Sequence, residues 1–304
     1  MNYIESVKLD FNRQISELGK INNDKISDNL IFVGSGDSYV VGLVVEYLTD
    51  HKCKCYSPSD LLNSELSNDR IYCFVSVTGR IRSNISVAEH ALQAGSKTVA
   101  ITFNENSKLA QICDKIIQPR LKRLHTPAPG FGGFVANVVA CLQVAGIPVP
   151  KKFDMWYQNA VKISQNVLDS IALPEDTIFV LGNNILHPLA LYTSFQLAEF
   201  FGTTAVAHKL EEFCHAPVFG IKKSHQLCIL GQKEESISQM LHRLGFKLSY
   251  MELYNQDILS QLFESIFFVQ NLMLLLAEKY GYTTLKYLMM KDVLKASSDI
   301  IYSA

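Results

Sequence analysis

Short apolar runs alternate along this chain with segments whose apolar positions recur at helical spacing. The run from Leu30 to Val33 leads through a glycine-containing loop into an amphipathic helix that begins near Tyr39. The segment from Ile71 to Ile101 repeats this order, with a strand, a polar loop, a helix as far as Ala94, a stop at Gly95 and a second strand. Because strands alternate with helices, we expect an α/β fold with mainly parallel sheets.

The same opening recurs in the second half of the chain, where the run beginning at Ile178 ends in Gly182 and precedes another helical pattern. A chain of 304 residues, 48% of them hydrophobic, can bury two cores of about 150 residues each. Pro148 and Pro150 interrupt one helical pattern just before the next begins at Asp154. We therefore predict two related doubly wound, flavodoxin-like domains, residues 1–150 and 151–304, that bind ligands at the carboxyl ends of their strands.

Two polar loops follow the first two predicted strands of the N-terminal half. Backbone N–H groups and hydroxyls at the start of a helix favour an anion, because the helix dipole is positive there. A single loop of this kind is also what an ordinary turn looks like, so only the two together predict a phosphate site. The candidate binding residues are Ser35, Gly36, Asp37 and Ser38 in the first loop, and Ser76, Thr78, Gly79 and Arg80 in the second. Arg80 and Arg82 could supply charge to a phosphate, or could equally form a solvated helix start.

Glu199 and His215 are the candidate proton-transfer groups. Glu199 lies near the end of an apolar helical run, and His215 lies sixteen residues later at the end of a following loop. A carboxylate and an imidazole together can move protons around a carbonyl group. The alternative for each residue is a salt-bridged surface carboxylate or a structural histidine.

The segment that carries these two residues resembles the SIS (sugar isomerase) family, in particular isomerase domains of the glucosamine-6-phosphate synthase type. The resemblance covers roughly forty residues, in which Gly182, Pro188, Glu199, Glu212 and His215 keep the order and spacing of the family. The two polar loops are similar to the paired phosphate loops of SIS domains. The sequence departs from the family pattern at Gln196, where a lysine is usual, at Ile81, and at the glycine-rich entry from Gly130 to Gly133.

The resemblance implies aldose–ketose chemistry on a phosphorylated sugar, either a hexose 6-phosphate or an amino-sugar phosphate, by an isomerase or a deaminase. Glu199 would move the proton between C1 and C2, and His215 would assist ring opening from the neighbouring subunit of a homodimer. Near the C-terminus, Lys291 would reach the sugar, with Lys295 as the alternative. Both lysines could instead be exposed residues of a terminal helix. No metal or other cofactor is expected, since this proton transfer needs a base and stabilisation of the oxyanion.

A different class of function is a sugar-phosphate-binding regulatory protein that does not turn its ligand over. The departures at Gln196, Ile81 and the glycine-rich entry favour it, whereas Glu199 and His215 argue against it. The sequence starts almost directly in the SIS-like region, so we expect no glutaminase domain of the kind that a complete glutamine-dependent synthase carries.

Composition excludes several other classes. A net charge of −1 and the lack of a basic stripe argue against nucleic-acid binding. The seven cysteines have neither disulfide-like nor metal-like spacing, which favours small buried residues in a reducing compartment. The polar N-terminus does not look like a signal peptide, and the run from Ser265 to Ala277 is too short to span a bilayer. We therefore expect a cytoplasmic protein without membrane association.

Overall fold

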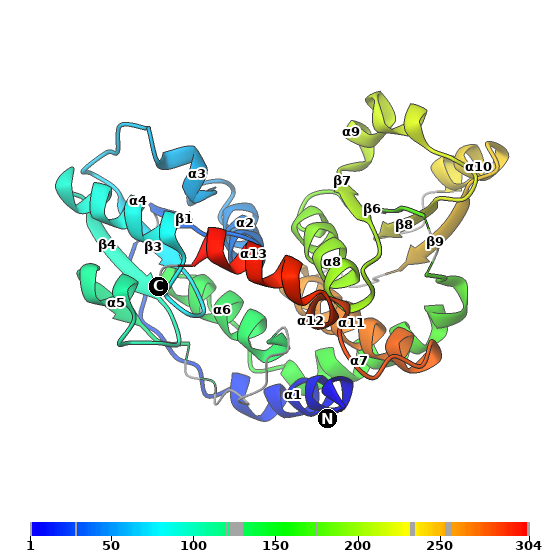
Figure 1. Ribbon diagram of the computed structural model, residues 1–304, viewed down its shortest axis with the longest axis horizontal. Helices are drawn as coiled ribbons and strands as arrows, with labels where there is room; N and C mark the ends of the chain where they lie inside the picture. Colours follow the sequence, from blue (N-terminus) through cyan, green and yellow to red (C-terminus); the bar gives the residue numbers. More distant parts are fainter. Residues whose placement is uncertain are drawn as a thin grey trace. The chain divides into compact units, whose positions relative to one another are not determined.

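The computed structural model describes residues 2–27, 29–119, 121, 130–173, 176–231, 235–252 and 257–302. The chain forms two compact units, each built around a parallel sheet (Figure 1). The first-sheet unit contains Arg13–His125, Gly130–Lys151 and Met290–Ala304. The second-sheet unit contains Met1–Asn12, Thr126–Pro129 and Lys152–Met289. The predicted α/β fold with parallel sheets is thereby confirmed.

Five parallel strands form the sheet of the first-sheet unit, in the order β2-β1-β3-β4-β5. This is the flavodoxin-like order, in which the chain leaves the first strand on one side and returns on the other. In the register of the two central strands, Val33 lies opposite Phe74. The strands are β1 (Leu30–Val33), β2 (Lys54–Tyr56), β3 (Ile71–Val75), β4 (Lys97–Ile101) and β5 (Lys115–Ile117). Strand β1 has the bounds that the sequence predicts, and all four of its residues are buried.

Helices cover the first sheet with their apolar positions. Helix α2 packs against α6, and α4 packs against α3 and α5. Helix α4 ends after Gln93 and is followed by Gly95 at a φ of 77°, the left-handed conformation expected of a helix stop. The helices are α1 (Tyr3–Leu18), which begins in the other unit, α2 (Asp37–Leu48), α3 (Pro58–Leu61), α4 (Arg82–Gln93), α5 (Lys108–Ile112), α6 (Phe131–Val144) and α13 (Lys291–Ile301).

The second sheet repeats the plan with four parallel strands in the order β7-β6-β8-β9. Its strands are β6 (Ile178–Leu181), β7 (Ala205–His208), β8 (Gln226–Leu230) and β9 (Lys247–Met251). The α-helices are α7 (Phe153–Val167), α8 (Leu186–Phe201), α9 (Leu210–His215), α10 (Glu235–Arg243), α11 (Ile258–Lys279) and α12 (Lys286–Met289). Short 3₁₀ helices, η1 and η2, follow at Leu168–Ser170 and Pro217–Gly220.

Helix α11 has 22 residues, more than its central apolar run suggested, and by length and composition it could cross a membrane. Of its most apolar window, 78% is buried inside the protein, as in a core helix. It also buries polar groups that are paired: Asn271 donates to Ser164 Oγ at 2.6 Å, and Glu264 accepts from Asn159 Nδ2 at 2.8 Å. Such pairing fits a helix packed against α7 within the protein.

The two compact units exchange their chain ends relative to the predicted division at residue 150. One junction between the units, Lys151 to Lys152, lies beside that division. However, Met1–Asn12 belongs with the second sheet, and Met290–Ala304 belongs with the first. The division into residues 1–150 and 151–304 as separate domains stays a prediction.

Candidate functional site

The loop after β1 brings backbone N–H groups to the start of α2. Gly34 can approach α2 closely only because it lacks a Cβ atom, which would lie 2.7 Å from the backbone carbonyl carbon of Ser38. Gly36 then takes φ 57° and ψ −130°, a conformation that only glycine adopts readily. Within the described residues, the N–H groups of Ser35, Gly36 and Asp37 donate no hydrogen bond. The loop thus leaves three donors at a helix N-terminus for a ligand.

Asp37 is the first residue of α2 and is partly buried. Burial raises the pKa of its carboxyl from 3.8 to about 7, because removing the group from water disfavours its charged form. At neutral pH the group is therefore close to half protonated. A carboxyl in this state repels a phosphate less than a full carboxylate does, and when protonated it can donate a hydrogen bond.

The loop after β3 is held by its own hydroxyl groups. Gly79 N–H donates to Ser76 Oγ at 3.1 Å, and Arg80 N–H donates to Thr78 Oγ1 at 3.3 Å. Gly79 has a φ of 64°, and a Cβ atom there would lie 2.0 Å from Ser107 Oγ, so a side chain is excluded. Helix α4 follows with Ile81 as its N-cap, which provides no side-chain cap. The Arg80 side chain is exposed at this end of the loop.

The two loops lie at the same edge of the first sheet, as the sequence predicts. Strands β1 and β3 are parallel neighbours, so both loops leave from carboxyl ends. Because β2 lies on the other side of β1, this edge is also the point where the strand order reverses. Crevices at such switch points are the usual binding places of doubly wound sheets.

The C-terminal helix belongs to the same unit as these loops. Tyr302 forms an antiparallel bridge with Ile81, directly after the second loop. Lys291 is the first residue of α13 and Lys295 lies one turn later, and both are exposed. A helix of 11 residues is about 16 Å long, so the bridge at Tyr302 and Lys291 are separated by roughly that length.

Glu199 lies near the end of α8 in the second-sheet unit and is partly buried. Gln196, one turn earlier, is 0% exposed. Neither its Oε1 nor its Nε2 has a hydrogen-bond partner in the described structure. The sequence singled out Gln196 as a departure from a family pattern but gave no sign of this unpaired state.

His215 is the last residue of α9, a short helix where the sequence predicted a loop. Its side chain is 73% exposed, and its Nε2 lies 3.9 Å from Glu211 Oε1 on the same helix. An exposed pair of this kind contributes little to stability.

The second-sheet unit does not bring Glu199 and His215 together. Helix α8 is about 24 Å long and returns the chain to the amino edge of the sheet, where β7 begins. Strand β7 then runs to the carboxyl edge, where α9 carries His215. Strand β7 has four residues, and a strand advances about 3.3 Å per residue. The backbone positions of Glu199 and His215 therefore lie at opposite edges of the sheet, roughly 10 Å apart or more.

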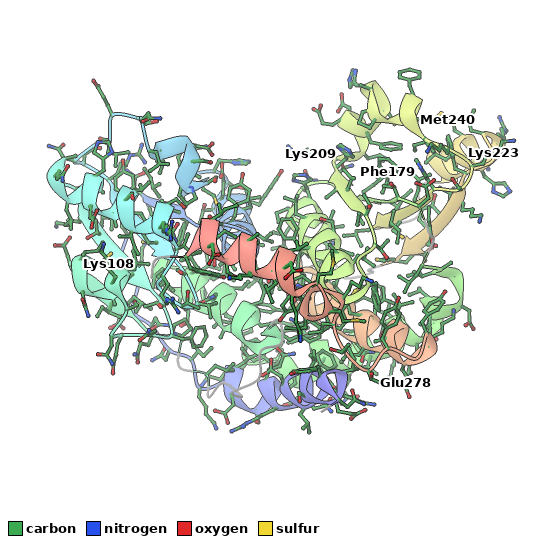
Figure 2. The ribbon with its side chains drawn as sticks, viewed as in Figure 1. Lys108, Phe179, Lys209, Lys223, Met240 and Glu278 are labelled. Atoms are coloured by element: carbon green, nitrogen blue, oxygen red, sulfur yellow. The ribbon has the colours of Figure 1, made fainter. Side chains whose placement is uncertain are left out.

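The carboxyl edge of the second sheet holds a cavity of about 200 Å³ where β6 and β8 end. Aliphatic side chains and Tyr250 form most of its described wall, and Asn183, Asn184 and Gln261 provide carboxamides. Asn183 Oδ1 accepts from the N–H of Leu210 at 3.0 Å. Lys209, labelled in Figure 2, precedes Leu210 at the start of α9. His187 follows Leu186, which lines the cavity. Burial lowers the pKa of the His187 imidazole, and the charges of Lys209 and His208 lower it further.

The described residues contain no group of three or more His, Cys, Asp or Glu side chains that could hold a metal ion. The seven cysteines all lie within the described residues and form no disulfide bond; five are buried, Cys113 is partly buried and Cys214 is exposed. The candidate ligand-binding features considered in the described part of the chain are the loops, the carboxylates and the cavity described above.

Comparison with known proteins gives a clear result for the fold only. No family model and no curated protein sequence matches this chain. Among solved structures, the C-terminal domain of glucosamine-fructose-6-phosphate aminotransferase from Francisella tularensis is similar, with a TM-score of 0.70 and 14% identity over 92% of this chain and 96% of that one.

Two further structures show the same likeness. Glucosamine-6-phosphate deaminase from Thermotoga maritima has a TM-score of 0.72 and 18% identity, over 90% of this chain and 94% of that one. Tagatose-6-phosphate ketose/aldose isomerase from Escherichia coli has a TM-score of 0.60 and 16% identity, over 91% and 89%. The resemblance to isomerase domains of the glucosamine-6-phosphate synthase type is confirmed at the level of the fold, which this chain shares with these three structures.

Proposed function

We propose that this protein acts on a phosphorylated sugar, as an aldose–ketose isomerase or as a deaminase of an amino-sugar phosphate. The observation that carries the proposal is the pair of loops at the switch point of the first sheet. Unpaired N–H groups at Ser35, Gly36 and Asp37 face the same edge as Ser76, Thr78 and Arg80. Donors of this kind fit a phosphate group. The three similar solved structures are named for activities on hexose 6-phosphates or their amino derivatives, which supports the same substrate class.

Glu199 is the proposed base. It removes the proton on the carbon next to the carbonyl, and the electron pair moves onto the carbonyl oxygen to give an enediolate. The proton then returns to the former carbonyl carbon while the hydroxyl proton of the adjacent carbon passes to the former carbonyl oxygen, which leaves the carbonyl on the adjacent carbon. Its place near the end of a packed helix, partly buried, gives the carboxylate a fixed position. Lys291 or Lys295, in the unit that carries the phosphate loops, is proposed to assist at the sugar.

His215 is proposed to open the sugar ring for a second copy of the chain in a homodimer. Two observations support this role: the imidazole is exposed, and the fold of its own unit places it at the edge opposite Glu199. Mixing Glu199→Gln with His215→Ala tests it. If each site takes one residue from each copy, about one quarter of wild-type activity should return when subunits exchange at random.

The test of the reaction is exchange of the C1 or C2 hydrogen with solvent, followed by proton NMR in heavy water with fructose 6-phosphate, glucose 6-phosphate and glucosamine 6-phosphate. Glu199→Gln should slow exchange roughly 10²-fold to 10⁴-fold and leave binding nearly intact, because it removes the base and keeps the size. The matched control is Glu278→Gln, an exposed carboxylate of the same unit, which should change nothing (Figure 2).

A second candidate is binding without turnover, which the departures from the family pattern at Gln196, Ile81 and the glycine-rich entry from Gly130 to Gly133 favour. Under this reading, the wild type binds a sugar phosphate in a thermal-shift assay but exchanges no hydrogen with solvent. That result would refute the enzyme proposal. Exchange at equal rates in wild type and Glu199→Gln would keep the reaction and assign the base to another group, with Glu212 next to be tested.

A further inference from the structure

The cavity at the carboxyl edge of the second sheet is not used by the reaction proposed above. It lies where β6 and β8 end, and the strand order β7-β6-β8-β9 reverses at β6. Leu186 lines the cavity at the start of α8, whereas Glu199 lies near the other end of that helix, roughly 20 Å further along. Crevices at such reversal points are the usual ligand sites of doubly wound sheets. The cavity is therefore a candidate site for a second ligand.

The described wall of this cavity carries no charge. Aliphatic side chains and the ring of Tyr250 form most of it, and none of its described residues is Asp, Glu, Lys, Arg or His. An ion placed there would lose its hydration without meeting an opposite charge. The ligand that fits this wall is uncharged and has apolar faces.

Three carboxamides interrupt the apolar wall, at Asn183, Asn184 and Gln261. Asn183 is fixed in orientation, because its Oδ1 accepts from the N–H of Leu210 at 3.0 Å. The side-chain amides of Asn184 and Gln261 make no hydrogen bond to the described residues. Their donors and acceptors are thus available to a ligand.

A carboxamide matches the polar edge of a purine base. It offers a donor and an acceptor side by side, and asparagine or glutamine pairs in this way with the N6 amino group and the N7 ring nitrogen of adenine. The flat faces of the base would meet the aliphatic wall. At about 200 Å³, the cavity is smaller than the roughly 300–1,000 Å³ of pockets that hold drug-sized ligands, so it fits one ring system and not a whole nucleotide.

We propose that this cavity binds a neutral purine base, with adenine as the preferred ring system. The carboxamides of Asn184 and Gln261 bind the polar edge of the base, the aliphatic wall covers its faces, and an attached ribose would extend towards solvent. Binding involves no covalent step. The inference concerns a second site and does not depend on the proposed sugar-phosphate reaction.

Isothermal titration calorimetry of the full chain with adenosine, which is uncharged, tests the site. Saturable binding is expected with a Kd on the order of 1 mM or tighter. Inosine should bind more weakly, because it has an oxygen in place of the N6 amino group. Leu210→Trp places a larger side chain at a partly exposed position of the wall, so it should weaken adenosine binding at least roughly tenfold by occupying the cavity.

A second variant removes one carboxamide and spares the fold. Asn184 has a φ of 51°, a conformation that glycine adopts without strain, so Asn184→Gly should fold and should bind adenosine roughly tenfold more weakly. The matched control is Asp50→Gly, at a φ of 48° in the first-sheet unit, which should leave adenosine binding unchanged.

Three results would overturn the proposal. The first is a wild type that shows no saturable binding of adenosine. The second is unchanged adenosine affinity in Leu210→Trp or, if that variant does not fold, in Asn184→Gly. The third is tighter binding of N-acetylglucosamine than of adenosine, which would assign the cavity to a sugar. Hydrogen exchange on sugar phosphates is measured separately, and its absence in the wild type would refute the proposed reaction without touching this inference.

Discussion

The carboxyl edges of the two sheets share one backbone feature and differ in their side chains. Gly34 and Gly182 directly follow β1 and β6, the first strand of each sheet, and a Cβ atom at either position would lie within 2.7 Å of the following helix backbone. The next two residues differ in chemistry: Ser35 and Gly36 in one loop, Asn183 and Asn184 in the other. The helices then begin at Asp37 in one unit and at Leu186 in the other.

This difference separates what the fold requires from what a ligand requires. The glycines are needed for the close approach of strand and helix, so both units keep them. The hydroxyls and the carboxyl of the first loop serve no comparable packing purpose, and the second loop has apolar residues and carboxamides around a cavity instead. We infer that the first edge, not the second, is suited to a phosphate.

The test with the largest expected effect adds one negative charge to each of the two loops, in separate variants. Ser35→Asp should weaken binding of glucose 6-phosphate roughly 100-fold, because a carboxylate close to a dianion costs several RT even when partly screened. Asn183→Asp is the control at the equivalent position, where Oδ1 can still accept from the Leu210 N–H. Isothermal titration calorimetry measures both. Equal losses in the two variants would contradict the assignment of the phosphate to the first edge.

A second test concerns the shared backbone. Gly34→Ala and Gly182→Ala should each destabilise the protein by about 1–3 kcal/mol, since the added methyl group meets helix backbone at under 3 Å. Urea unfolding measures the change. If one variant were neutral, the two strand–helix junctions would not be equivalent.

The smallest test uses the titration of Asp37. Its pKa is raised from 3.8 to about 7, so between these values the folded state holds a proton that the unfolded state has lost, and stability falls as the pH rises. Asp37→Asn removes the ionisable group. It should leave stability unchanged near pH 4 and raise it by about 1–2 kcal/mol at pH 8, less than the full shift because the carboxyl is partly exposed.

Denaturation of both proteins at pH 4 and pH 8 checks this expectation. A gain of equal size at both pH values would mean that the carboxyl is not the cause. Ile185 lies three residues after Gly182, as Asp37 lies three residues after Gly34. Its side chain does not titrate, so any stability change caused by Ile185→Val should not depend on pH.

The sequence was a good guide to the first unit, because its signals are local. The four apolar residues from Leu30 to Val33 and the glycine after them fix a strand and a turn within a few residues. The two polar loops proposed to bind phosphate lie at one edge because β1 and β3 are parallel neighbours, which follows from strand order alone. The stop of α4 before Gly95 needed only a residue that accepts a positive φ.

Other features depend on contacts between residues that are far apart in the sequence, and the spacing of residues along the chain does not predict such contacts. The spacing of sixteen positions from Glu199 to His215 suggested a pair, but β7 lies between them in the chain and carries His215 to the other edge of the sheet. The raised pKa of Asp37 results from burial by surrounding residues. The unpaired amide of Gln196 is visible only when every neighbour is known.

The exchange of chain ends between the units has a consequence for how the protein is made. A ribosome releases the chain from the N-terminus at about 5–20 residues per second, and early segments often fold before later ones emerge. Here the first sheet is synthesised early, but the bridge between Ile81 and Tyr302 cannot form until Tyr302 has been synthesised. The first-sheet unit therefore reaches its final state only after nearly all of the second has been synthesised. We therefore expect cotranslational folding to end, not to begin, at the two polar loops that follow β1 and β3.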